Sequence, residues 1–182
     1  MLKPFTNRLY RASFLAALLF SAHSHAGKDD FTKLIEIASN YQEGDGITKK
    51  FIYRGEVLII QGSLRVEADE VKLDASQGEG NEIFFATGNP AQYSQIQEDG
   101  SLVTAKANNI EYHLNTRSLT LTGKAEIKQN ASSVRGESIK FNMELEQIIA
   151  QGSDQKSGRV ITTIQPVKKP RKTASEQQDK QP

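Results

Sequence analysis

Closely spaced carboxylates are the first side chains in this sequence that could do chemistry. Four of them lie in one short stretch, at Glu67, Asp69, Glu70 and Asp74. Two carboxylates on either side of a sugar can cleave a glycosidic bond, one as the acid and the other as base or nucleophile. These acids alternate with apolar residues or fall at a turn, as the solvent-facing side of a sheet requires. A glycosidase is therefore the weakest of three hypotheses, and it would need two acids that converge on one pocket.

Nucleophilic and metal chemistry have even less support. The chain has 182 residues with no Cys and three His, and two of those, His23 and His25, lie in an N-terminal leader. Disulfides, a Cys nucleophile and a zinc site made of Cys and His clusters are therefore excluded. His113 has no nucleophile predicted beside it, and the sequon at Asn130 is better explained as a turn. We predict a protein that is not an enzyme and has no metal site and no cofactor.

Both ends of the chain differ in composition from the middle. Residues 1–26 have a basic start, an apolar run from Ala12 to Ala22 and a Ser24-His25-Ala26 cleavage pattern, which together predict a cleaved signal peptide. Residues 166–182 contain three Pro, five basic and two acidic residues, which predicts a disordered basic tail. One domain, residues 27–165, remains between them. Its acidic residues outnumber its basic ones, 20 to 15, and no basic stripe is interleaved with aromatics, so we expect no nucleic-acid partner.

The domain itself shows the period-two alternation of half-buried antiparallel strands. In residues 118–128, Leu119, Leu121, Ala125 and Ile127 share one face, and residues 51–59 repeat this pattern. Similar strands centre on Gly55, Gly88, Gly123 and Gly152, at spacings of 33, 35 and 29 residues, which indicates repeated units. The fold class that this predicts is all-β, an antiparallel jelly roll or open barrel built from two-strand units.

The second strand of each unit contains a break in its alternation. The apolar face slips by one residue at Asp69-Glu70, Asn108-Asn109 and Glu137-Ser138. A bulge or bend at these points would restore the phase and curl the sheet. Stacked units leave an edge at the first strand, about 34–38, and at the last, about 159–164. The apolar residues of these edges would not discourage pairing with another chain: Ile35, Ile37, Val160, Ile161 and Ile164.

The order of several short blocks resembles the OstA-like family of periplasmic lipopolysaccharide-transport bridge proteins. The two strongest blocks are 53–62, YRGEVLIIQG, and 88–93, GNPAQY, and the likeness extends over nearly all of 31–165. The glycine-rich first hairpin at 43–46 departs from the family pattern and leaves the length of the first strands open. The resemblance implies a slightly twisted β-jelly roll, open at both ends, that holds the acyl chains of lipid A in its interior.

The resemblance also implies partners and a site. Family members associate head to tail through their edge strands and carry lipopolysaccharide from an inner-membrane extractor complex, through LptC, to the outer-membrane assembly protein LptD. The positions that match the family's lipid-contacting residues are Phe31, Ile35, Tyr93, Tyr112 and Leu114. A second hypothesis remains open, an exported structural or carbohydrate-binding β-domain with a filled core, because alternation alone does not distinguish a core from a lipid groove.

Overall fold

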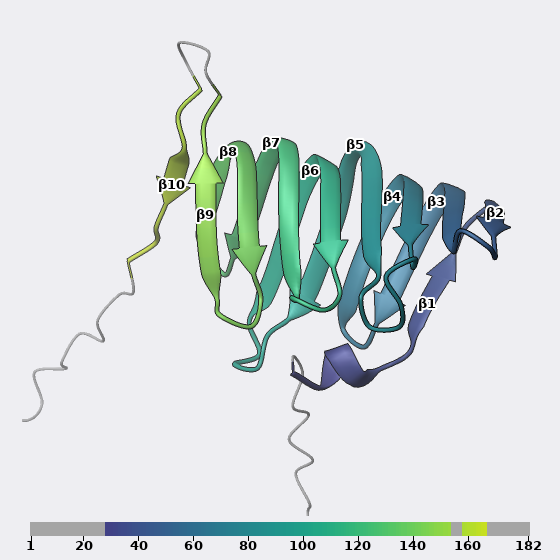
Figure 1. Cartoon of the computed structure of the whole chain (residues 1–182). Coiled ribbons are helices and arrows are strands. Elements are labelled where there is room, and N and C mark those ends of the chain that lie inside the picture. The colour runs from purple at the N-terminus through teal and green to yellow at the C-terminus, as the bar shows by residue number, and fades with distance from the viewer. Residues whose placement is uncertain (1–27, 154–157, 167–182) are drawn as a thin grey trace, which may run out of the picture.

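A single antiparallel sheet contains nearly all of the regular structure (Figure 1). The computed structural model describes residues 28–153 and 158–166, so the expected signal peptide and all of the expected tail except Pro166 lie outside the described residues. The one helical element in the described part is a 3-10 turn, η1 (Lys28–Thr32). The strands are β1 (Ile35–Ala38), β2 (Tyr41–Asp45), β3 (Lys50–Gln61), β4 (Leu64–Asp74), β5 (Ile83–Ile96), β6 (Leu102–His113), β7 (Ser118–Gln129), β8 (Ser132–Asn142), β9 (Gln147–Gln151) and β10 (Ile161–Thr163).

The six long strands, β3 to β8, form a meander in which each strand pairs with the next. Turns predicted from the sequence connect several of them, including Asn130 at the β7–β8 turn, where its φ is +54°. Local connections of this kind place sequence neighbours side by side in the sheet. The predicted all-β antiparallel class is confirmed.

Each long strand bends near its middle, so that the sheet folds over into two layers (Figure 1). The phase slips predicted at Asp69-Glu70 and Asn108-Asn109 are present, because burial changes from even to odd positions at the first and from odd to even positions at the second. The extra residue lies on the neighbouring strand, which contains the glycine that marks the repeat. It does not lie on the strand whose alternation slips. Between Arg54 and Val57, three steps on β3 face two on β4.

Two of the bulges contain a glycine with the same backbone conformation, and these two glycines lie two sequence repeats apart. Gly55 and Gly123 have φ of +77° and +80°, and each is followed by another residue with positive φ, Glu56 or Lys124. Glycine adopts this conformation without steric cost, which explains its place at the bend. A glycine read as a repeat marker in the sequence is therefore the point at which the sheet turns over.

The two layers take opposite halves of every long strand. The layer that begins with β1 ends with β10, and the layer that begins with β2 ends with β9; we call these the β1 layer and the β2 layer. The sequence predicted one edge strand at each end, whereas the structure has two, because the bent outermost strand has one half in each layer. The predicted edges are also shorter than expected, at Ile35–Ala38 and Ile161–Thr163.

The core lies between the layers. Near the bend, where the layers meet, the buried residues include both alanines such as Ala86 and larger side chains in the same row, such as Ile110 and Leu121. Near the opposite rim, where both layers end in turns, they are large and include Tyr93, Tyr112 and Phe84. We call this open rim the mouth.

Candidate functional site: the apolar interior and its mouth

The five residues predicted to contact lipid lie at the mouth half of the interior. Tyr93 and Tyr112 are each only 2% exposed, whereas Phe31, Ile35 and Leu114 are partly buried against the same core. Tyr93 comes from the β1 layer and Tyr112 from the β2 layer, so the set spans both sides of the interior. The alternation of β5 and β6 turns both tyrosines inward, because each is in phase with buried neighbours.

The two tyrosines combine apolar rings with satisfied hydroxyls. The Tyr112 ring stacks on Phe84, with centroids 5.9 Å apart, and its hydroxyl lies 3.5 Å from Gln61 Oε1. The Tyr93 hydroxyl donates to Gln95 Oε1 at 2.6 Å. Burial raises the pKa of Tyr93 well above its ordinary value and raises that of Tyr112 in the same direction. Both phenols therefore remain neutral at any physiological pH and suit an apolar ligand.

Three buried polar residues at the mouth were missed by the sequence analysis. Asp30, Gln61 and Gln95 are 5%, 3% and 1% exposed. Gln61 and Gln95 lie in phase with buried Ile59 and Tyr93, so a polar residue on the inward phase was the signal available. Gln61 Nε2 donates to the backbone oxygen of Lys33 at 3.2 Å. A buried polar group needs such partners, and these residues form a polar rim at the mouth of an otherwise apolar interior.

The interior has two small openings among the described residues. One, a cavity of about 130 Å³, lies at the mouth beside Phe31 and Met143. The other, of about 100 Å³, lies at the end formed by β8, β9 and β10 and is lined by apolar side chains that include Val103, Ile127 and Phe141. Between these openings, inward side chains such as Tyr93, Ile110 and Leu121 are at most 2% exposed. A long apolar chain would therefore have to part the layers rather than enter a preformed tunnel.

The predicted edge residues differ in orientation. Ile35 and Ile37 on β1 pack against the core, so this strand would offer its backbone edge rather than these side chains. Val160, Ile161 and Ile164 are 38%, 56% and 73% exposed, and only Ile161 belongs to β10. The sequence analysis also missed Ile148 and Ile149 of β9, which are exposed at the same end of the sheet.

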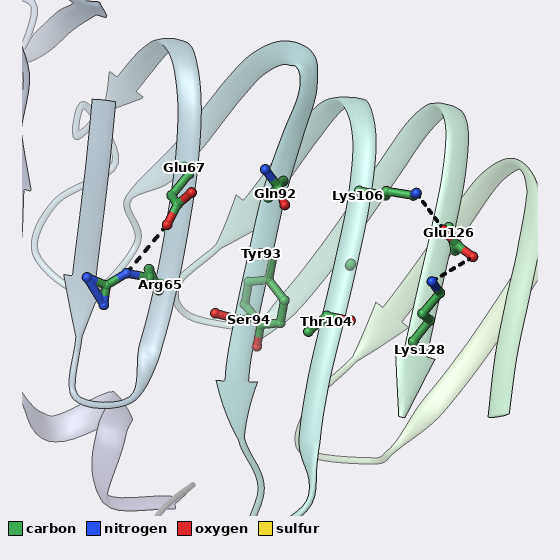
Figure 2. A pocket seen from close by; sticks show the side chains of 10 residues that line it. Arg65, Glu67, Gln92, Tyr93, Ser94, Thr104, Lys106, Glu126 and Lys128 are labelled. Atoms are coloured by element: carbon green, nitrogen blue, oxygen red, sulfur yellow. Dashed lines mark ion pairs between the residues drawn. The ribbon is translucent and has the colours of Figure 1, made fainter. Parts of the chain in front are cut away.

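The outer face carries charged side chains in pairs (Figure 2). Glu67 lies 3.6 Å from Arg65, and in the same groove Glu126 is bound by Lys106 at 2.9 Å and Lys128 at 3.4 Å. Burial alone would raise the pKa of Glu126, but the hydrogen bonds from Lys106 and Arg135 outweigh it and lower the pKa to about 2. Glu126 is therefore ionised at neutral pH and offsets part of the positive charge of the three cations around it.

The acids that opened the sequence analysis do not converge on one another. Glu70 binds Arg54 at 2.7 Å, and Asp74 lies 3.4 Å from Lys50. His113 is paired with Glu111. In the part of the chain that the structure describes, no group of His, Asp and Glu is arranged to hold a metal ion. The described helical element is also too short to cross a membrane.

The folded sheet, its apolar interior and its open ends define an open-ended β-jelly-roll protein. The chain belongs to the LptA/(LptD N-terminal domain) family of lipopolysaccharide-transport proteins, whose family model matches residues 36–147. This confirms the family to which the sequence blocks pointed.

Individual relatives agree over most of the chain. The lipopolysaccharide export system protein LptA of Haemophilus influenzae is 33% identical over 84% of this chain and 90% of its own. That of Escherichia coli is 30% identical over 88% of both chains. The crystal structure of LptH, described as the LptA-homologous periplasmic component of the lipopolysaccharide transport device of Pseudomonas aeruginosa, superposes with a TM-score of 0.69. It is 26% identical in sequence and covers 76% of this chain and 99% of its own.

Proposed function

We propose that this protein carries lipopolysaccharide through the periplasm, with the acyl chains of lipid A held between the two sheet layers. The observation that carries the proposal is a folded sheet that does not close. Among the described residues its apolar interior lies between edges at both ends and extends to the mouth. Membership of a lipopolysaccharide-transport family supports the same reading.

The energetics of the interior suit a conduit. Each methylene group buried from water contributes about 0.8 kcal/mol, so a few acyl chains outweigh the cost of parting the layers without any specific clamp. The lining near the mouth is apolar except for hydroxyl and amide groups and the carboxyl group of Asp30, and the described interior contains no Lys or Arg among its buried residues. Many weak contacts allow the cargo to be bound and then passed on.

We propose further that copies of the protein join end to end. The β1 and β2 strands of one copy would pair with the β9 and β10 strands of the next, because an unpaired strand edge is a template for strand addition. The row of copies would form a bridge from the inner-membrane extractor complex, through LptC, to LptD at the outer membrane. The periplasmic relative and the predicted signal peptide support this location.

Photocrosslinking tests the lipid site. A photoreactive amino acid is placed at Tyr112 or Leu114, and the full chain is irradiated in cells and then probed for lipopolysaccharide. Thr120 is the matched control, because it lies on the outer side of the same layer, directly opposite Glu111 in the adjacent strand. We expect a lipid adduct at both interior positions and none at Thr120. No adduct at the interior positions would favour the alternative, an exported structural or carbohydrate-binding domain with a filled core.

A further inference from the structure

The N-terminal turn η1 lies across the mouth of the interior (Figure 1). Its Asp30 side chain reaches the β1 layer, where it accepts hydrogen bonds from the Ser63 backbone N–H at 2.9 Å and from Gln95 Nε2 at 3.2 Å. The Ser63 hydroxyl also donates to it. The adjacent Phe31 reaches the β2 layer, where its ring lies 4.7 Å from the guanidinium of Arg117. Two consecutive residues thus connect the two rims.

Asp30 is a buried carboxyl group whose described hydrogen-bond partners are neutral. It is 5% exposed, and its described hydrogen-bond partners are an amide, a hydroxyl and a backbone N–H rather than a cation. Removing a carboxylate from water without a counter-charge is costly, and hydrogen bonds offset only part of that cost. Release of η1 would return the carboxylate to water, so the bonds lost at the mouth are replaced by hydration.

The opposite rim is shaped to receive this carboxylate. Gly62, at the β3–β4 turn, has φ of +62°, and a Cβ at this position would lie 2.1 Å from Asp30 Oδ1. The Asp30 carboxyl group therefore fits here only because Gly62 has no side chain. We call this space the seat of Asp30. The mouth is not filled completely by η1, because a cavity of about 130 Å³ remains between Phe31 and the turn that contains Met143.

The tyrosines predicted to contact lipid lie directly behind this seat. Gln95, which donates to Asp30, also accepts the hydroxyl of Tyr93. Gln61, beside the hydroxyl of Tyr112, donates to the backbone oxygen of Lys33 just after η1. A chain that enters the interior from the mouth must therefore pass the position that η1 occupies.

We infer that η1 is a removable plug: it closes the mouth in the lipid-free protein, and the acyl chains of the cargo displace it and take the place of Phe31 and Asp30. This inference rests on the proposed function, since it assigns the route by which the same interior is loaded. Phe31 then serves as an internal substitute for an acyl chain, which keeps the apolar mouth covered until lipid arrives.

A disulfide lock tests the plug. The chain has no cysteine, so Asp30→Cys with Ser63→Cys introduces one pair, at positions whose side chains touch. In the control, Thr120→Cys with Lys140→Cys joins two strands on the outer side of the β2 layer, where these residues are directly opposed. Binding of purified lipopolysaccharide is measured on the full mature chain, oxidised and then reduced. We expect the oxidised plug pair to bind at least about tenfold more weakly, with recovery on reduction, because the open state is no longer populated.

Two results would overturn the plug. One is equal binding by the oxidised and reduced forms of the plug pair. The other is an equal loss in the oxidised control pair, which would mean that any stiffening of the sheet blocks the lipid. Failure of every form to bind, including the unmodified chain, would instead contradict the proposed function, and the plug would then be judged by a measurement that needs no lipopolysaccharide.

That measurement uses a fluorescent apolar probe, N-phenyl-1-naphthylamine, which brightens in apolar surroundings. Asp30→Ala with Phe31→Ala removes both anchors of η1, and Leu34→Ala, at a residue 86% exposed, is the control. We expect the double variant to increase probe fluorescence several-fold over the parent, and the control to match the parent, with circular dichroism confirming that both retain their sheet. Equal fluorescence in all three would overturn the plug.

Discussion

The hydroxyl of Tyr93 lies 3.0 Å from Met143 Sδ and so connects the two layers of the roll near the mouth. Tyr93 belongs to the β1 layer, and Met143 follows the end of β8 in the β2 layer. The contact crosses the interior where acyl chains are proposed to lie. A lipid that enters must separate this pair, and the flexible thioether of Met143 can repack at little cost.

Removing the Tyr93 hydroxyl should destabilise the protein without closing the interior. In Tyr93→Phe, Gln95 Oε1 loses the donor that lies 2.6 Å away, and Gln95 is 1% exposed. We expect the free energy of unfolding in urea to fall by about 1–3 kcal/mol, the cost of an unsatisfied buried acceptor. Tyr41→Phe is the control, because its hydroxyl bonds to Glu43 on an exposed site, and it should change stability by less than about 0.5 kcal/mol. Equal stability of Tyr93→Phe and the parent would contradict the structure.

Glu126 should make stability depend on acid pH. Its folded pKa of about 2 lies below the ordinary value of 4.5, so its contribution is complete above pH 4.5 and is lost as the pH falls through about 2. In Glu126→Gln this contribution is absent at every pH. The parent should exceed the variant by about 1–3 kcal/mol in free energy of unfolding at neutral pH, and the gap should narrow as the pH falls from 4.5 to 2.

Glu67→Gln is the matched control for that measurement. Glu67 lies on the same outer face, but its side chain is 56% exposed and its distance to Arg65 is 3.6 Å. An exposed pair of this kind contributes about 0–1 kcal/mol. A gap for Glu126→Gln that stays constant across the same pH range would show that its cations do not hold Glu126 ionised.

The glycine at the bend should be less replaceable than a glycine in an open turn. Gly123 and Gly100 have nearly the same φ, +80° and +79°, so alanine is strained equally at both. A Cβ at Gly123 would lie 2.7 Å from Asn108 Nδ2, whereas at Gly100 it meets nothing within 4 Å. We expect Gly100→Ala to lower the free energy of unfolding by about 1 kcal/mol. Gly123→Ala should lower it by about 1 kcal/mol more than Gly100→Ala does, as measured by thermal or urea unfolding. Equal costs would mean that Asn108 moves aside freely.

Removing β10 should weaken association while preserving the fold. A chain that ends at Gly158 lacks β10, and a chain that ends at Gln165 lacks only the tail. Because all three β10 residues are exposed, stability should change little, but the dissociation constant for self-association should rise about tenfold or more in light scattering across concentration. Equal assembly by the two truncated chains would show that β10 is not an associating edge.

The alternation of residues 118–128 predicted which side chains share the inward face, and the structure confirms this for Leu119, Leu121 and Ile127, which are all buried. Alternation is a local property of the strand, so it can be read without knowing what the strand packs against. The slips at Asp69-Glu70 and Asn108-Asn109 were readable for the same reason. Their cause was not, because the extra residue lies on the paired strand and depends on register across the sheet.

The candidate site shows the same division. The family resemblance predicted the two interior tyrosines, but not the seat of Asp30. That seat joins Asp30 to Gly62 and Ser63, and three strands, β1 to β3, lie between them in the sequence. Likewise β2 escaped prediction, and the strand expected around Gly152 is present only as β9, which ends at Gln151. Each is short and exists as a strand only because half of a bent neighbour offers it hydrogen bonds. Short strands are marginal without such partners.

By itself, the sequence determined the all-β class, the repeated strands, the inward faces and the family, since these depend on residue types and spacings along the chain. Only the tertiary structure decided that the sheet folds into two layers, that each end carries two edge strands, and that η1 lies across the mouth. These features depend on which distant segments meet. Contacts such as those of Phe31 with Arg117 and of Tyr93 with Met143 form only after the long strands have bent at their glycine bulges.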